Sequence, residues 1–111
     1  MKIAVAVVGD EVSPHFGHAP VFAIFSVDAG RVEREDIPNP GHEPGRLPAL
    51  MRSMGITHVI AGGMGPRAVD HFCDAGIEVI MGVSGEVESA VAAFLDGTLE
   101  VGESMCHHPR E

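Results

Sequence analysis

The sequence contains no tryptophan and no tyrosine among its 111 residues, and it has only two cysteines. Cys73 and Cys106 are too few for the disulfide framework that stabilises many small secreted domains. Without tryptophan or tyrosine the polypeptide absorbs almost no visible or near-ultraviolet light. Any such absorbance would therefore report a bound chromophore.

Basic residues are also scarce, with seven lysines and arginines against sixteen acidic residues and a formal net charge of −9. A protein that follows a phosphate backbone needs clustered Lys and Arg, so nucleic acid is excluded as a partner, and an anionic membrane surface is disfavoured. No apolar run approaches transmembrane length, and the first ten residues are too short for a signal peptide and lack a cleavage site. We therefore expect a cytoplasmic protein with no membrane partner.

Apolar segments alternate with Gly and Pro turn signals in an order that predicts five strands and three helices. The length fits one domain spanning residues 1–111, with residues 102–111 as a flexible tail. The expected strands are 2–8, 21–27, 31–37, 57–61 and 77–81, and the expected helices begin near Leu47, at Pro66 and at Glu86 and end at Gly55, Gly76 and Gly97.

Right-handed crossovers place these strands in a mixed sheet of order 3-2-1-4-5 with helices on both faces. This is the three-layer α/β arrangement of ribonuclease-H-like folds. Ligands of open α/β sheets bind where neighbouring connections diverge, here between the first and fourth strands, and the loops Ser13–Ala19 and Gly62–Gly65 flank that point. Nuclease catalysis is disfavoured because the first strand has no carboxylate before Asp10 to hold two metal ions.

The loop Ser13–Ala19 carries two histidines three residues apart, His15 and His18. Neutral imidazoles are good donors to a metal ion or metal cluster. The alternative is a Pro/Gly turn whose histidines cap backbone groups, and the spacing alone favours that alternative.

The loop Gly62–Gly65 joins an expected strand to an expected helix. Its glycines allow close approach to the backbone, the helix N-terminus offers N–H donors to an anion, and Arg67 adds positive charge. A G-x-G-x-x-A pattern starts at Gly63, but a dinucleotide site needs an acidic residue at the end of the next strand, where Met81 and Gly82 stand. The alternative is that the glycines serve only strand–helix packing.

The run Cys106-His107-His108 combines a thiolate with two imidazoles, which suit soft or borderline metals. With one cysteine there, one chain cannot form a Cys₄ zinc site. A frayed polar terminus is the alternative. Cys73 falls on the apolar face of its helix, so we expect a small buried hydrophobic residue.

Two blocks of the sequence match a known family. From Ser13 the chain reads S-x-H-F-G-x-A, followed by Phe22, and from Gly62 it reads G-G-M-G-x-x-A-x-x-x-F-x-x-x-G-I-x-V. These blocks resemble the dinitrogenase iron–molybdenum cofactor biosynthesis family, which includes NifX-like proteins and the carboxyl-terminal domain of NifB-like proteins. Asn39-Pro40 with His42 is similar to the middle loop of that family.

The resemblance implies a ribonuclease-H-like fold without nuclease activity and a site for an iron–sulphur or iron–molybdenum type cluster. By position, His15, His18, His42 and Met64 would line this site. The full set of expected cluster-binding residues is Ser13, His15, His18, His42, Gly62, Gly63, Met64, Gly65 and Arg67, and the expected metal ligands are His15, His18, Cys106 and His107.

We therefore expect a non-catalytic carrier of a metal cluster that works in metallocluster assembly with cluster donor and acceptor proteins. The net charge of −9 opposes an anionic cluster unless Arg67, protonated histidines or helix N-termini supply local positive potential. A zinc- or nickel-binding module using the same histidines is one alternative, and a metal-free regulatory interaction domain is another. An enzyme is disfavoured because no acid–base pair stands out.

Overall fold

The computed structural model describes residues 1–41 and 46–99. The expectation of a mixed α/β sheet with three helices is confirmed, and the ribonuclease-H-like assignment remains a prediction. The tail expected at residues 102–111 lies outside the described residues. The elements in chain order are β1 (Lys2–Val8), β2 (Glu11–Val12), the 3₁₀ helix η1 (Phe16–His18), β3 (Val21–Asp28), β4 (Arg31–Pro38), α1 (Arg46–Ser53), β5 (His58–Ile60), α2 (Pro66–Asp74), β6 (Glu78–Ile80) and α3 (Val87–Asp96).

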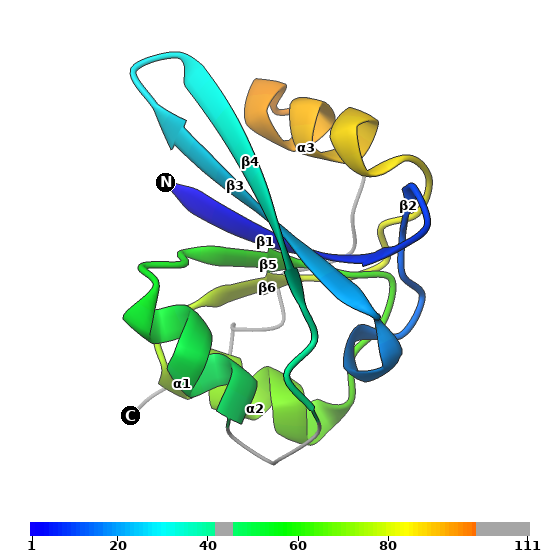
Figure 1. The fold of residues 1–111 in the computed structure, drawn as a ribbon, viewed down its shortest axis with the longest axis vertical. Coiled ribbons are helices and arrows are strands. Elements are labelled where there is room, and N and C mark those ends of the chain that lie inside the picture. The colour runs from blue at the N-terminus through cyan, green and yellow to red at the C-terminus, as the bar shows by residue number, and fades with distance from the viewer. Residues whose placement is uncertain (42–45, 100–111) are drawn as a thin grey trace.

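The sheet follows the order β4-β3-β1-β5-β6, and the short β2 pairs with β1 outside this path (Figure 1). β1, β3 and β4 form an antiparallel meander, whereas β5 and β6 run parallel to β1. The carboxyl ends of β1, β4, β5 and β6 therefore meet at one edge. Connections at that edge are the ones expected to hold a ligand.

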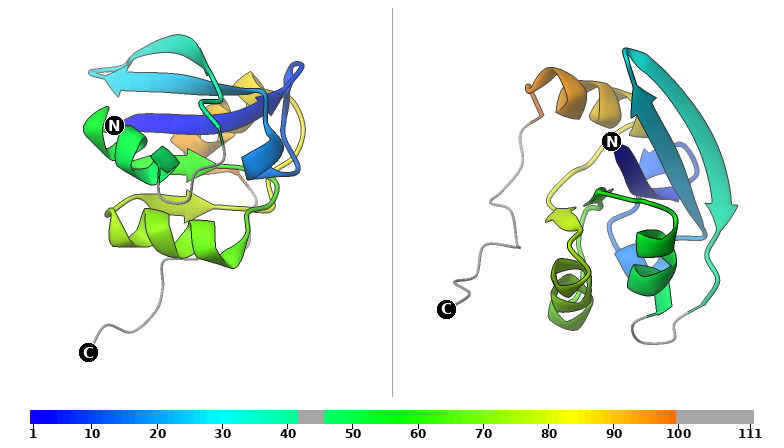
Figure 2. Two further views of the ribbon diagram at one scale, coloured as in Figure 1. Left: turned by 60° about the horizontal axis from the view of Figure 1, so that its bottom comes forward. Right: turned by 90° about the vertical axis from the view of Figure 1, so that its left-hand side faces the viewer.

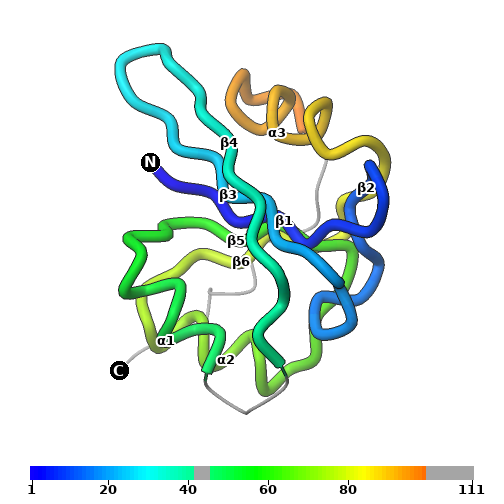
Figure 3. The backbone as a smooth tube through the Cα atoms, viewed as in Figure 1, coloured from blue at the N-terminus to red at the C-terminus, as the bar shows by residue number. Residues whose placement is uncertain are grey.

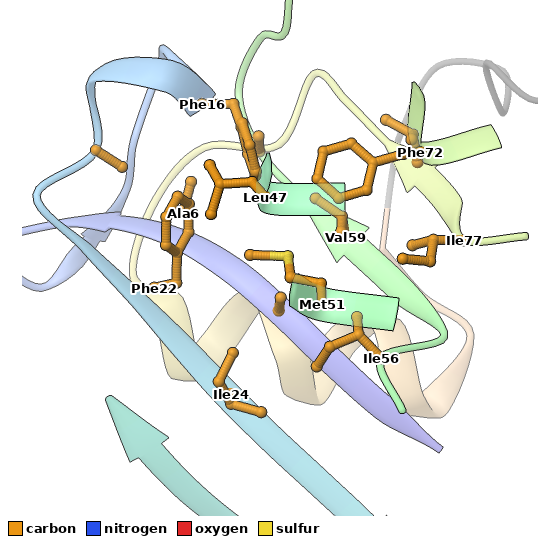
Figure 4. Close-up of a cluster of buried hydrophobic side chains, with 14 of the residues drawn as sticks. Ala6, Phe16, Phe22, Ile24, Leu47, Met51, Ile56, Val59, Phe72 and Ile77 are labelled. Atoms are coloured by element: carbon orange, nitrogen blue, oxygen red, sulfur yellow. The ribbon is translucent and has the colours of Figure 1, made fainter. Parts of the chain in front are cut away.

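The helices cover the two faces of the sheet unequally, with α1 and α2 on one face and α3 on the other (Figure 2). The larger core lies under α1 and α2, and Figure 4 shows Phe22, Met51 and Phe72 converging in it. The smaller core lies under α3 and includes Val87 and Val91. Each face of β1 is thus buried, as its unbroken apolar sequence requires.

Several features differ from the sequence-based expectation. β2 and η1 were not predicted, because a two-residue strand and a single 3₁₀ turn leave no periodic signal. Charged and apolar residues alternate between Arg31 and Ile37, which predicts a half-exposed strand, but every residue from Arg31 to Asp36 is exposed. β4 is the edge strand and, among the described strands, pairs only with β3. Arg34 links it to α3 through a bond to Glu88 at 2.9 Å. The same guanidinium bonds Asp36 within β4 and lies 5.5 Å from the ring centroid of Phe25 in β3.

Among the described helices, none is both long enough and apolar enough to cross a membrane. The longest, α3, has ten residues and ends at Gly97, which adopts a left-handed conformation with φ of 81°. A glycine enters this region without strain, which explains why the helix stops there.

Candidate functional site

Main-chain hydrogen bonds join the two loops that the sequence singled out. The Gly62 amide donates to the Ser13 carbonyl at 2.9 Å, and the Phe16 amide donates to the Gly63 carbonyl at 2.9 Å. Ser13 is itself fixed to the sheet, because its amide donates to the Ala6 carbonyl at 2.8 Å. The loop after β2 therefore lies directly on the loop after β5, at the carboxyl edge of the sheet (Figure 3).

This junction explains two of the glycines in the second loop. A β-carbon on Gly62 would stand 2.8 Å from the Pro14 Cα atom, and one on Gly63 would stand 2.9 Å from the Pro14 carbonyl oxygen. Both distances are shorter than real side chains permit. A β-carbon on Gly65 would meet nothing within 4 Å. Gly62 and Gly63 therefore serve close contact between the two loops rather than contact between strand and helix.

The buried Ser13 shapes the first loop from within. Its side chain is only 4% exposed. The Ser13 Oγ donates to the His15 carbonyl at 2.9 Å and accepts a hydrogen bond from the His15 amide at 3.2 Å. These short-range bonds bend the chain just before His15. The Ser13 hydroxyl thus sets the direction of the histidine-bearing segment.

Phe16 anchors the same segment to the core. Its ring is buried, and the ring centroid lies 5.0 Å from that of Phe22 and 5.2 Å from that of Phe72. Figure 4 shows the three residues within the larger core. The residues on either side of this anchor, His15 and His18, are exposed. A buried aromatic ring between two exposed histidines holds both imidazoles at the surface of a fixed turn.

The two imidazoles stand close to each other. The ring centroids of His15 and His18 are 6.1 Å apart with an interplanar angle of 84°. A metal–nitrogen bond is about 2.0–2.1 Å, so two rings on one tetrahedral ion have centroids about 5 Å apart. The observed separation is about 1 Å longer, which suits neighbouring atoms of a cluster directly and a single ion after a small rotation of the side chains.

The second loop adds a thioether, an exposed cation and a helix N-terminus. Met64 is half-buried and packs against the larger core, and Arg67 is exposed in the first turn of α2. Gly65 is the N-cap and Pro66 occupies the first helical position, so the amides of Arg67 and Ala68 have no acceptor within the helix. Such amides and a guanidinium favour a negatively charged ligand.

The described part of the chain does not complete a metal site by itself. Within residues 1–41 and 46–99, no group of three or more His, Cys, Asp or Glu side chains could hold a metal ion. The expected site residues His42, Cys106 and His107 lie outside those ranges. Cys73, expected to be a small buried hydrophobic residue, is instead half-buried on α2 against the larger core and is disulfide-bonded.

Sequence reasoning missed the role of Asn39. Its Nδ2 donates to the Ala19 carbonyl at 2.8 Å and to the Gly17 carbonyl at 3.4 Å, and its Oδ1 accepts from the Gly41 amide at 2.9 Å. This side chain links the segment after β4 to the histidine loop. The run Asn39-Pro40-Gly41 indicated a turn, because an Asn side chain readily closes a turn two residues on, and its match to the middle loop of the family gave no partner for the side chain.

Charge is distributed unevenly around the site. Arg46, Arg52 and Arg67 lie on α1 and α2, which carry only two acidic residues, Asp70 and Asp74. The opposite side of the carboxyl edge is acidic. There Glu11 faces Glu86 across an isolated antiparallel bridge, with Asp10 beside them. The excess of negative charge therefore lies outside helices α1 and α2.

Comparison with known proteins places this chain in a family. A family profile described as dinitrogenase iron-molybdenum cofactor matches residues 1–97. The chain belongs to the dinitrogenase iron–molybdenum cofactor family. An uncharacterized protein of Methanocaldococcus jannaschii, MJ0580, is 31% identical over 106 residues, covering 90% of each chain.

Two solved structures are similar to this chain over most of its length. The crystal structure of PH0822 is 30% identical with a TM-score of 0.83, covering 92% of this chain and 96% of that one. The apo form of the orange protein from Desulfovibrio gigas is 30% identical with a TM-score of 0.75, covering 93% of both chains. The resemblance drawn from the Ser13 and Gly62 blocks is confirmed at the level of the family.

Proposed function

We propose that this protein binds and carries a metal cluster of the iron–sulphur or iron–molybdenum type during metallocluster assembly, without transforming it chemically. In this role it receives the cluster from a donor protein and passes it to an acceptor protein in the cytoplasm. Membership of the dinitrogenase iron–molybdenum cofactor family supports the cargo class. The same family background supports the ribonuclease-H-like fold class as the architecture of the carrier.

One observation carries the proposal. His15 and His18 are exposed with ring centroids 6.1 Å apart, on a loop that is bonded through main-chain atoms to the glycine loop preceding Arg67. Imidazole nitrogens can bind the metals of a cluster, while the guanidinium and the free amides of the first turn of α2 can face its anionic sulphur or oxygen atoms. A ligand set of this kind holds cargo at the surface, where a partner protein can reach it.

The electrostatics of the α1–α2 layer support an anionic cargo. A chain with net charge −9 should repel anions at long range, but Arg67 lies in the first turn of α2, directly after the glycine loop. Electrostatic interactions between exposed charges are screened over a Debye length of about 8 Å at physiological salt, so the charges nearest the site dominate the potential there. The net charge therefore permits a cluster on this side of the edge.

The same histidine pair favours a second candidate function. A small rotation of the two side chains, which closes their centroid separation of 6.1 Å by about 1 Å, would let both imidazoles bind one zinc or nickel ion. Two protein ligands would leave the remaining positions to water or to residues outside the described ranges. This alternative predicts stoichiometric metal without visible iron–sulphur or molybdenum bands.

Anaerobic reconstitution separates these functions. The apo-protein is incubated with iron, sulphide and molybdate, desalted, and measured for metal content and for its visible and near-ultraviolet spectrum. The chain lacks Trp and Tyr, so its own near-ultraviolet absorbance is also very weak. If the protein carries a cluster, visible bands should appear and should be lost in His15→Ala and His18→Ala. The bands should be retained in His71→Ala, because His71 is an exposed residue of α2 away from the two loops. A parallel sample of the apo-protein is incubated with zinc or nickel. One bound ion per chain in that sample, with no visible bands after the iron incubation, supports the second candidate.

Absence of metal under every condition contradicts both candidates and leaves a metal-free regulatory interaction domain. Turnover of the bound cluster or of another substrate by the loaded protein contradicts the non-catalytic part of the proposal. Bands that persist in both His15→Ala and His18→Ala would show that the cluster binds elsewhere on the protein.

A further inference from the structure

Asn39 occupies a distinctive place in the loop cluster, because one side chain contacts two different segments. Its amide nitrogen reaches the carbonyls of Gly17 and Ala19, which flank His18, at 3.4 Å and 2.8 Å. Its carbonyl oxygen accepts from the Gly41 amide at 2.9 Å, and its own amide donates to the Pro20 carbonyl at 3.1 Å. Asn39 is half-buried where it does this.

We propose that Asn39 is a positioning residue that holds the His18 segment in its ligand-binding conformation before any cargo arrives. This inference rests on the proposed function, because it assigns a role to Asn39 within the same site. Its physical content is pre-organisation: a loop already fixed in the bound geometry loses less conformational freedom when the ligand binds.

The hydrogen bonds of the His18 segment show why an additional clamp matters there. η1 is a single 3₁₀ turn closed by long bonds, from the His18 amide to the His15 carbonyl at 3.2 Å and from the Ala19 amide to the Phe16 carbonyl at 3.3 Å. Turns of this kind have poor hydrogen-bond geometry and little stability of their own. The Asn39 amide binds carbonyls on both sides of His18 and so restrains the backbone that carries the imidazole.

The chemistry of the clamp requires an amide at position 39. An aspartate has nearly the same shape and can still accept from the Gly41 amide, but its carboxylate cannot donate to the carbonyls of Gly17 and Ala19. Asn39→Asp therefore removes the hydrogen bonds to the Gly17 and Ala19 carbonyls and retains the bond from the Gly41 amide. Asn39→Ala removes all three.

The first experiment uses the metal-free protein, so its outcome does not depend on the proposed function. Amide hydrogen exchange is measured by NMR at His18, Ala19 and Gly41. Asn39→Asp should accelerate exchange at His18 and Ala19 with little change at Gly41, whereas Asn39→Ala should accelerate exchange at all three. Ser53→Ala is the matched control, because it deletes one side-chain bond to a carbonyl, Ser53 Oγ to Leu50 at 2.6 Å, on α1.

The second experiment asks whether the clamp acts through His18. Co²⁺ is titrated into the protein and followed at the His15 ring signals by NMR, in the wild type, Asn39→Asp, His18→Ala and the double variant. Loss of a residue that orients a metal ligand typically weakens binding by roughly 10-fold. We expect Asn39→Asp to weaken Co²⁺ binding by that factor in the wild-type background and by less than about 2-fold in the His18→Ala background. Such non-additive effects are the mark of two residues that act together.

The outcomes distinguish the two proposals. If Co²⁺ binds the wild type and Asn39→Asp weakens binding equally in both backgrounds, Asn39 acts only on general stability and the inference is wrong. Unchanged exchange at His18 and Ala19 in Asn39→Asp also overturns it, whatever Co²⁺ does. If Co²⁺ fails to bind the wild type while exchange responds as expected, the metal-binding proposal is damaged and the conformational role of Asn39 stands.

Discussion

Gly62 lies so close to Pro14 that a β-carbon on Gly62 would stand 2.8 Å from the Pro14 Cα atom. The neighbouring atoms belong to the backbone, so they cannot swing aside as a side chain could. Gly62→Ala should therefore destabilise the protein by about 1–3 kcal/mol, the usual cost of overpacking. Urea unfolding followed by far-ultraviolet circular dichroism measures this loss.

Gly65→Ala is the matched control for that substitution. Gly65 has an ordinary φ of −66° and open space where a methyl group would stand. The reduced freedom of the unfolded chain and the weaker N-capping by alanine act in opposite directions, so the change should stay within about 1 kcal/mol. Equal losses in the two variants would contradict the loop–loop origin of the Gly62 requirement.

Ala29 adopts a left-handed conformation that suits other residues better. It has φ of 51° and precedes Gly30, with φ of 83°, in the turn joining β3 to β4. Positive φ at both central positions is the type I′ pattern, for which Asn-Gly is preferred. Ala29→Asn should raise stability by about 0.5–1 kcal/mol, measured as an increase in Tm, whereas Gly30→Ala should lower it. A decrease with Ala29→Asn would count against the turn assignment.

Two acidic residues face each other across the bridge between β2 and the segment before α3. Glu11 and Glu86 are paired there and both are exposed. Like charges directly opposite one another in an antiparallel pair are destabilising by roughly 0.2–1 kcal/mol. Glu11→Lys should therefore stabilise the protein, and the gain should shrink in high salt because the interaction is screened. A gain that is independent of salt would point to a cause other than charge.

The burial of His58 predicts an acid-sensitive contribution to stability. Desolvation lowers the pKa of His58 from its ordinary 6.5, while the nearby Glu78 carboxylate opposes this shift and the amino terminus adds to it. The His58 ring lies 5.3 Å from the Phe94 ring of α3. The unfolded chain then binds the proton more readily, so stability is lost as the pH falls through 6.5 toward the lower folded-state pKa.

Substitutions at His58 and its partner test this sign. His58→Gln should reduce the loss of stability between neutral pH and pH 5, measured by urea unfolding across that range. Glu78→Gln should make the loss steeper, because it removes the carboxylate that raises the pKa of His58. Identical pH profiles in the wild type and both variants would show that His58 does not contribute.

Sequence patterns were most informative where an element repeats one signal over several residues. The apolar run from Lys2 to Val8 predicted β1 with the bounds that the structure has. The Gly stop at Gly97 likewise marked the end of α3, because a left-handed residue there has a clear preference for glycine. Both signals are local, so they can be read from neighbouring residues alone.

The remaining features depend on contacts between distant segments. β2 exists because Val12 pairs with Val7 and because its amide bonds the Gly85 carbonyl, and neither partner can be identified from a two-residue stretch. The placing of His15 and His18 at the surface depends on Phe16, whose burial requires Phe72 from α2. The role of Asn39 could not be predicted, because it bonds carbonyls about twenty residues earlier.

The junction between the two loops is built from main-chain atoms, with the Gly62 and Phe16 amides as donors and the Ser13 and Gly63 carbonyls as acceptors. Substitution at His15, His18, Met64 or Arg67 leaves all of these donors and acceptors in place. Side chains at the exposed positions 15, 18 and 67 can therefore be exchanged without rebuilding the scaffold. The choice of a ligand and the ability to fold are separable in such an arrangement, so a single backbone is a suitable starting point for a series of binders that differ only at those three positions.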